Sequence, residues 1–442
     1  MNTKWIEYRD RIIFDTDAAG FEGACAKARG ELAGKDDELL AALTVDLLSY
    51  LPRWITGNEN GALAEAVTRQ AEENLVVLQS RAGQIRAQAV EIEKSNLVKL
   101  SRLADEGKIN NRWGNDNGLG IMDAMRRGAA LVTTNPLIIN MARKAAPEVY
   151  DKVRDEINAK YAGQPVEKRI SYLTLDVVLE NCRALRGIYE KTNRQGGYVN
   201  CQVNPNDSKD ADKMAEEVFF VYGEAEKALS GSPNIVFKLP GTQASLQAAK
   251  MVTERGIGIN ITVNFSVAQS LAFAEVIQKG CAARSYVTMM SGRLDDPIAA
   301  ELSALGEADA AELSKNASMA VTRRVYRELI ARGLDKTEIL VASLRGPWNF
   351  DASITDEPAS RIVISAFPDK WAEYDSAPRS IVSHIAEPMP EDVIGRLNKS
   401  DIFRKAYAAD GMRPEEFDMY TPVQQTIGAF IDSYAELKEY MG

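Results

Sequence analysis

The chain has 442 residues, long enough for two or three average domains or for one α/β barrel with terminal extensions. Its 53 Lys and Arg residues are outnumbered by 63 Asp and Glu, and the formal charge of −10 argues against a nucleic-acid-binding protein, which usually carries a basic stripe. The one histidine, His384, excludes metal sites and proton relays that need two or three imidazoles. The four cysteines are scattered without C-x-x-C spacing, so we expect neither a zinc cluster nor a disulfide framework.

The N-terminal segment, MNTKWIEYRDRIIFDTD, mixes charges with its apolar residues and lacks the apolar core of a secretory signal. Elsewhere, no run approaches the roughly 18 apolar residues of a membrane span. The composition, 45% hydrophobic and 26% charged, is that of an ordinary globular protein. We therefore expect a soluble cytoplasmic protein that binds neither membranes nor nucleic acid.

Residues 1–108 are predicted to form a helical N-terminal extension. An apolar helical stretch opens at Asp36 and ends at Leu51, and a long helical pattern then runs from about Gly61 to Gly107. Apolar residues in this pattern recur every three or four positions, as in the seam of a helix packed lengthwise on another; they are Leu75, Leu78, Ala82, Ile85, Ala89 and Ile92. The seam predicts a helical hairpin packed within the chain, with a dimerisation helix of a homo-oligomer as the alternative.

Residues 109–388 are predicted to form the catalytic domain. Eight short β-type runs alternate here with amphipathic helical segments: 112–116, 130–136, 198–205, 234–240, 257–266, 284–290, 338–345 and 361–367. Eight βα units over about 260 residues predict an α/β fold, the TIM (β/α)8 barrel. A doubly wound sheet is the alternative, although its G-x-G-x-x-G opening is absent. Residues 389–442 are predicted to form C-terminal helices packed on the barrel.

Several predicted strands place polar residues on one face near their ends. Residues two positions apart in a strand share a face, and the polar sets that do so are Asn200, Gln202 and Asn204; Asn260, Thr262 and Asn264; Thr133 and Asn135; and Ser343 and Arg345. TIM barrels carry their active sites at the carboxyl ends of the strands. The repeated pattern therefore predicts a polar pocket at the barrel mouth. For any single set, a capped strand end or a satisfied buried amide is the alternative.

The most specific feature is Lys238 in the apolar run Ile-Val-Phe-Lys-Leu-Pro, residues 235–240. Lysine is depleted in strands and almost never fully buried unless it is paired. A buried amine loses solvation, its pKa falls, and it becomes a nucleophile toward carbonyl groups. The motif therefore indicates a Schiff-base lysine, with a lysine paired to a carboxylate or a solvated strand-end lysine as the alternatives.

Three further charged residues lie at or just past strand ends. Asp116 follows the first strand and is the natural proton acceptor for carbon–carbon cleavage beside an iminium ion; its alternative role is that of a turn residue before Gly118. Arg293 and Arg345 lie where TIM barrels often bind phosphate, and their guanidinium forks suit phosphate or sulfonate oxygens. Ion pairing at the surface is their alternative role.

These segments together resemble the transaldolase family of class I Schiff-base enzymes over about residues 110–370. The motifs that carry the resemblance are VTTNP at 132–136, GYVNCQVNP at 197–205, NIVFKLPGT at 234–242, GIGINITVNFSVAQ at 256–269, SGRLDD at 291–296 and EILVASLR at 338–345. They occur in the family's order along the chain. The resemblance implies a transferase of carbohydrate metabolism, in the pentose phosphate pathway, that needs neither a metal nor an organic cofactor.

The resemblance also implies a role for each site residue. Lys238 forms the imine with a ketose phosphate of the fructose 6-phosphate or sedoheptulose 7-phosphate type, and Asp116 takes the proton of the C4 hydroxyl. Thr262 and Gln202 position a catalytic water. The substrate is held by Thr133, Asn135, Asn260, Thr288, Arg293, Ser343 and Arg345. A dihydroxyacetone unit stays on the lysine until an aldose phosphate accepts it.

Two departures from the family pattern leave alternatives open. Transaldolases usually have Glu where this chain has Gln202, and an amide cannot accept a proton near neutral pH. Met290 stands where transaldolases have Phe and related fructose 6-phosphate aldolases have Tyr. The alternatives to a transaldolase are therefore an aldolase-like lyase, or a transaldolase for another anionic ketose such as 6-deoxy-6-sulfofructose. A third hypothesis is a catalytically inactive barrel that serves as a scaffold.

Overall fold

The computed structural model describes residues 3–57 and 61–442 and contains a closed barrel of eight parallel strands in the order of the sequence. The strands are β1 (Asn111–Asn115), β2 (Leu131–Thr133), β3 (Tyr198–Gln202), β4 (Ile235–Pro240), β5 (Gly258–Asn264), β6 (Ser285–Met290), β7 (Thr337–Ala342) and β8 (Ile362–Ala366). The pairing of β1 with β8 closes the barrel. All eight predicted strands are confirmed, β1 and β7 beginning one residue early, and the alternative of a doubly wound sheet is wrong.

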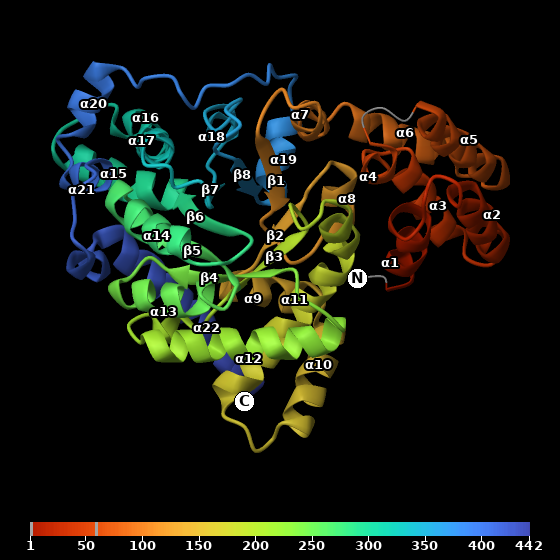
Figure 1. Ribbon diagram of the computed structural model, residues 1–442, viewed down its shortest axis with the longest axis horizontal. Helices are drawn as coiled ribbons and strands as arrows, with labels where there is room; N and C mark the ends of the chain where they lie inside the picture. Colours follow the sequence, from red (N-terminus) through yellow and green to blue (C-terminus); the bar gives the residue numbers. More distant parts are fainter. Residues whose placement is uncertain (1–2, 58–60) are drawn as a thin grey trace.

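Helices surround the strands on the outside (Figure 1). They are α8 (Ile121–Arg126), α9 (Pro136–Ala145), α10 (Pro147–Lys160), α11 (Val166–Lys191), α12 (Ala211–Leu229), α13 (Gln243–Thr253), α14 (Val267–Lys279), α15 (Ser291–Ala304), α16 (Ala310–Ser314), α17 (Ala317–Ala331), α18 (Pro347–Asp351) and α19 (Pro368–Asp375), with a short 3-10 helix η2 (Pro205–Asp207) after β3. The tail adds α20 (Glu391–Leu397), α21 (Asp401–Tyr407), η3 (Pro414–Met419) and α22 (Thr421–Met441). The last of these, α22, packs against α9, α11 and α15.

The N-terminal helices gather on one side of the barrel (Figure 1). They are α1 (Thr3–Arg9), the π-helix η1 (Asp10–Phe14), α2 (Phe21–Leu32), α3 (Asp37–Leu47), α4 (Arg53–Thr56), α5 (Gly61–Val77), α6 (Ala82–Glu93) and α7 (Asn96–Asp105). The long helix expected over 61–107 is thus three helices, and Ser95 caps the last with its hydroxyl. Its seam is buried except for the half-buried Ala82, and α5 and α6 both pack on α3. The seam therefore packs within the chain, and the alternative interpretation of these residues as the seam of a dimerisation helix is wrong.

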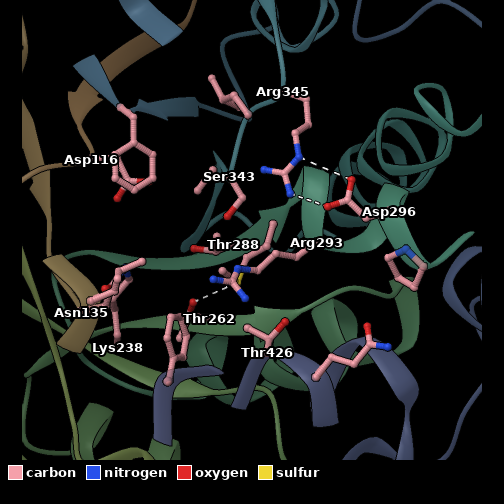
Figure 2. A pocket seen from close by; sticks show the side chains of 18 residues that line it. Asp116, Asn135, Lys238, Thr262, Thr288, Arg293, Asp296, Ser343, Arg345 and Thr426 are labelled. Carbon is pink, nitrogen blue, oxygen red and sulfur yellow. Dashed lines mark hydrogen bonds and ion pairs between the residues drawn. The ribbon is translucent and has the colours of Figure 1, made fainter. Parts of the chain in front are cut away.

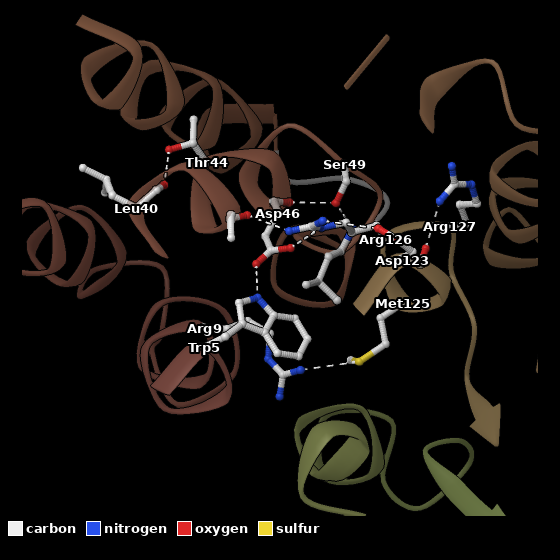
Figure 3. A network of polar contacts seen from close by, with 12 residues as sticks. Trp5, Arg9, Leu40, Thr44, Asp46, Ser49, Asp123, Met125, Arg126 and Arg127 are labelled. Carbon is white, nitrogen blue, oxygen red and sulfur yellow. Dashed lines mark hydrogen bonds and ion pairs between the residues drawn. The ribbon is translucent and has the colours of Figure 1, made fainter. Parts of the chain in front are cut away.

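A buried polar network ties this extension to the barrel (Figure 3). The carboxylate of Asp46 on α3 is fully buried; it accepts a hydrogen bond of 2.6 Å from the Trp5 indole and pairs at 2.6 Å with Arg126 on α8. Arg9 stacks over Trp5 at 4.5 Å and donates to the Met125 sulfur at 3.4 Å. A buried charge is tolerated only when it is paired, so this network fixes α1 and α3 against α8.

The barrel interior is built in two layers that differ in polarity. Near the amino ends of the strands, the inward-facing residues are mostly apolar or aromatic and form one buried cluster: Leu131, Tyr198, Val236, Tyr286, Leu340 and Val363. Two residues further along, the same faces carry buried Thr133, Asn200, Lys238, Thr288 and Ser365. Alternation along a strand keeps each pair on one face, so a polar layer lies above an apolar floor at the carboxyl ends.

None of the helices in the described ranges is long and apolar enough to cross a membrane.

Candidate active site

A cavity of about 380 Å³ opens above the polar layer at the carboxyl ends of the strands. Its wall contains eight of the predicted site residues: Asp116, Asn135, Lys238, Thr262, Thr288, Arg293, Ser343 and Arg345. Figure 2 shows these side chains converging on one space from different strands and loops. Volumes of this order suit small molecules, and a pocket with several convergent polar groups at the mouth of a TIM barrel is the usual place of an active site.

Lys238 lines the cavity and is 6% exposed. Its Nζ donates a hydrogen bond of 3.2 Å to the backbone carbonyl of Thr134. Burial lowers the pKa of Lys238, the charge of Asp116 raises it in part, and the Arg293 guanidinium lowers it further. The predicted burial is confirmed, and the alternative of a solvated strand-end lysine is wrong.

Asp116 follows β1 and lines the same cavity. Its carboxylate accepts a hydrogen bond from the Thr133 hydroxyl, which also lies 3.1 Å from the hydroxyl of Ser365. Burial raises the pKa of Asp116, and the charge of Lys238 opposes that rise. The turn before Gly118 is held instead by the side chains of Asn115 and Asn117, so the alternative interpretation of Asp116 as the turn residue is wrong.

Three predicted residues lie outside the cavity wall. Thr133 lies below it and bonds to Asp116. Asn260 is fully buried; it donates to the Asn200 oxygen at 2.7 Å and accepts from the Thr288 hydroxyl at 2.5 Å. Gln202 is half-buried beside Lys238 in register, and its Oε1 has no hydrogen-bond partner among the described residues. Thr133 and Asn260 therefore support the wall residues Asp116 and Thr288 from beneath. Gln202 lies on β3, next to Lys238 on β4.

Two residues of the predicted polar faces, both near strand ends, point away from the cavity. Val263 has φ of 53°, and the register of β5 with β6 shifts between Ile261 and Asn264. This bulge turns Asn264 away from the cavity, and its side chain donates to Ser270 on α14 at 2.9 Å. Asn204 also leaves the cavity, because its side chain caps the 3-10 helix that follows β3. The face predicted from period-two alternation is wrong at both residues.

Met290 holds the bulged strand from the cavity side. Its sulfur accepts hydrogen bonds from the Thr262 hydroxyl at 3.4 Å and from the backbone N–H of Val263 at 3.3 Å. A thioether is a weak acceptor and has no proton to donate. The Thr262 hydroxyl therefore directs its proton to sulfur and its lone pairs toward the cavity.

The other end of the cavity is cationic. Arg293 is half-buried, and burial together with the positive charge of the nearby Arg345 lowers the pKa of its guanidinium. Arg345 pairs at 2.5 Å with Asp296, so surface ion pairing, the alternative considered for both arginines, applies to Arg345. Ser343 has φ of 55°, a conformation that costs a non-glycine residue free energy and is concentrated at functional sites.

The C-terminal helix α22 forms part of the wall with Gln425, Thr426 and Phe430. Figure 2 shows Thr426 on the side of the cavity across from Ser343 and Arg345. The Phe430 ring lies 5.3 Å from the guanidinium of Arg293. Sequence reasoning missed these residues because nothing in the local pattern of a helix at the chain end reports which part of the barrel it covers.

A (β/α)8 barrel with a buried lysine, a buried carboxylate and two arginines around one cavity has the architecture of an enzyme. Residues 121–359, more than half of the chain, match the family model described as transaldolase/fructose-6-phosphate aldolase. The chain belongs to this family.

Individual relatives are similar over parts of their length. The transaldolase of Thiobacillus denitrificans is 25% identical over 268 residues, 55% of this chain and 72% of that protein. The transaldolase of Mycolicibacterium smegmatis is 29% identical over 211 residues, 45% of this chain and 55% of that protein. Transaldolase 2 of Nostoc punctiforme is 33% identical over 142 residues, 32% of this chain and 35% of that protein. The match thus covers about half or less of the latter two relatives.

Proposed function

We propose that this protein is a transaldolase that transfers a dihydroxyacetone unit from a ketose phosphate to an aldose phosphate through a Schiff base on Lys238. The observation that carries the proposal is the placement of Lys238 and Asp116, both buried, in the wall of the cavity that also contains Arg293. A lysine whose pKa is lowered by burial is a nucleophile toward a ketone, and the arginines suit an anionic sugar.

The reaction uses these groups in sequence. The neutral amine of Lys238 adds to the C2 carbonyl carbon, and loss of water gives an iminium ion. Asp116 takes the proton of the C4 hydroxyl, the C3–C4 bond breaks, and the aldose leaves while the electron pair of that bond forms an enamine. The enamine carbon then attacks the carbonyl of an acceptor aldose, Asp116 returns its proton to the new hydroxyl, and water hydrolyses the imine.

The remaining residues hold the substrate and the water. Asn135 and Thr288 reach the sugar hydroxyls from the wall, with Asn260 and Thr133 positioning Thr288 and Asp116 from below. Thr262 and Gln202 position the hydrolytic water. Arg293, Ser343 and Arg345 hold the phosphate at the far end. Family membership supports a place in carbohydrate metabolism, and we propose the pentose phosphate pathway and the cytoplasm as its setting.

A lyase is the second candidate, and Gln202 favours it. An amide can orient water but cannot accept its proton, and Met290 offers no proton donor either. Gln202 thus lacks the carboxylate that transaldolases usually have at this position, whereas Met290 matches neither the Phe of transaldolases nor the Tyr of the related aldolases and favours neither reaction. In the lyase reaction, the enamine is protonated, water hydrolyses the resulting imine on Lys238, and free dihydroxyacetone leaves without an acceptor.

Trapping the imine tests the Schiff base. The protein is incubated with fructose 6-phosphate, reduced with borohydride, and digested for peptide mass analysis. We expect the adduct on Lys238, its loss in Lys238→Arg, and its retention in the control Lys250→Arg, a residue 60% exposed on α13. An adduct on another lysine, or none, overturns the mechanism.

Product analysis separates the two candidate reactions. Fructose 6-phosphate is supplied alone and then with an aldose phosphate acceptor. Sugar product only in the presence of the acceptor supports the transaldolase. Free dihydroxyacetone that is released without the acceptor, at a rate comparable to that of product formation with the acceptor, supports the lyase.

A further inference from the structure

The anion end of the cavity carries less positive charge than its two arginines suggest. The Nη2 of Arg345 lies 2.5 Å from one oxygen of Asp296, and its Nε lies 3.5 Å from the other (Figure 2). Asp296 is itself part of the cavity wall. Any anion held by Arg345 therefore also meets the field of this carboxylate.

Arg293 supplies the remaining positive charge. No carboxylate within the described ranges lies at ion-pair distance from its guanidinium, which faces the Phe430 ring at 5.3 Å. Summed over Arg293, Arg345 and Asp296, the anion end has a net charge of +1. A sulfonate carries one negative charge, whereas a phosphate monoester carries between about 1.5 and 2 near pH 7, by analogy with phosphorylated side chains.

The backbone of Asp296 is fixed within helix α15. Asp296 lies in the second turn of α15, and its side chain is 61% exposed, so losing Arg345 to a ligand leaves it hydrated. Arg345 can therefore turn toward an anion at small cost, since exposed ion pairs contribute little. The charge of Asp296 nonetheless stays at the cavity and repels each negative charge of the ligand.

We propose that Asp296 is a specificity-determining residue that biases this site toward ketoses with a singly charged terminal group and against those with a doubly charged one. The inference rests on the proposed function, because it concerns the anionic end of the same substrate. In water, two unit charges about 4 Å apart interact strongly enough to change an equilibrium constant about fivefold. Removing the charge of Asp296 therefore favours the phosphate over the sulfonate by about two- to fivefold, because the phosphate carries about half to one more negative charge.

Binding without imine formation tests this proposal. The protein carries Lys238→Met throughout, and calorimetry gives the Kd of fructose 6-phosphate and of 6-deoxy-6-sulfofructose. The two Kd values are compared with and without Asp296→Asn. The matched control is Glu436→Gln. Like Asp296, Glu436 is a partly exposed carboxylate in an ion pair, here with Lys144 at 2.6 Å.

We expect Asp296→Asn to tighten the binding of both sugars and to shift the ratio of their Kd values about two- to fivefold toward the phosphate. Added salt should shrink the shift, because it screens exposed charges. The control should leave the ratio unchanged. A ratio that is the same with and without Asp296→Asn, or that moves toward the sulfonate, overturns the proposal.

The outcome is independent of the Schiff-base test. Borohydride trapping in the protein with Lys238 intact reports on the proposed function, whereas the Kd ratio in the Lys238→Met protein reports on Asp296 alone. If no adduct is trapped but Asp296→Asn shifts the Kd ratio, the role of Asp296 still holds. A trapped adduct with an unshifted ratio overturns only the role of Asp296.

Discussion

Replacing Asp116 by Asn separates imine formation from carbon–carbon cleavage. The charge of Asp116 raises the pKa of Lys238 against the lowering caused by burial. Asn has nearly the same shape without the charge, so the pKa of Lys238 falls further and more amine is neutral at a given pH below it. Imine formation in Asp116→Asn should therefore reach half of its maximal rate at a lower pH than in the wild type.

Cleavage should respond in the opposite sense. The amide oxygen introduced by Asp116→Asn would still accept the Thr133 hydrogen bond, but the amide has no basic group for the C4 hydroxyl proton. Loss of a positioned general base costs about 10²- to 10⁴-fold in rate. We expect a loss of that size in the release of the aldose, at every pH at which the wild type is active.

Two substrates report the two steps. Dihydroxyacetone has no C3–C4 bond, so borohydride trapping with it across a pH series measures imine formation alone, and fructose 6-phosphate measures cleavage. The control is Asp369→Asn, whose carboxylate is 72% exposed on α19. A half-maximal pH that moves upward, or cleavage within tenfold of the wild type, would refute the assigned roles of this pair.

Three further predictions concern stability, anion binding and product partition. Asp46→Ala removes the buried carboxylate partner of Arg126, which keeps, among the described carboxylates, only the exposed Asp123 at 3.4 Å, and should lower the free energy of unfolding by about 3–5 kcal/mol in urea titrations; an unchanged midpoint would contradict the network. Gly292→Ala would place a Cβ 2.3 Å from the Arg345 guanidinium carbon, and displacing that charge-assisted contact should raise KM for the phosphorylated ketose about tenfold, with kcat less affected. Gln202→Glu should raise transfer relative to release of free dihydroxyacetone, measured by product analysis, and an unchanged partition would remove Gln202 as the cause.

The barrel and much of its cavity could be predicted from the sequence because both depend on local patterns. Short β-type runs separated by amphipathic helices define the strands, and alternation within a strand places Lys238 on the face opposite Ile235 and Phe237. Topology then brings the carboxyl ends together, which is why Asp116 and Lys238, far apart in the chain, line one cavity. Each of these steps uses information within a few residues, plus the closure of the sheet.

The parts that could not be predicted depend on long-range packing. The bulge at Val263 turns Asn264 toward α14, and no residue type in that strand distinguishes it from a regular one. The path of α22 across the barrel, which brings Thr426 into the wall, depends on its packing against α9, α11 and α15. The partner of Asp296 is Arg345 and not Arg293, which is nearer in sequence, because the loop after β7 brings Arg345 to the first turns of α15.

The proton chemistry of the site follows from burial and not from imidazole. His384 bonds to Glu387 at 2.7 Å on the segment after α19 and lies outside the cavity wall. Lys238 and Asp116 are each driven toward the neutral form by burial, and each charge draws the other back toward its ionised form. The two shifts therefore bring an ordinarily basic group and an ordinarily acidic group closer together in proton affinity. In the proposed reaction this serves both steps, since the amine must be neutral to attack and the carboxylate must be basic enough to take a hydroxyl proton.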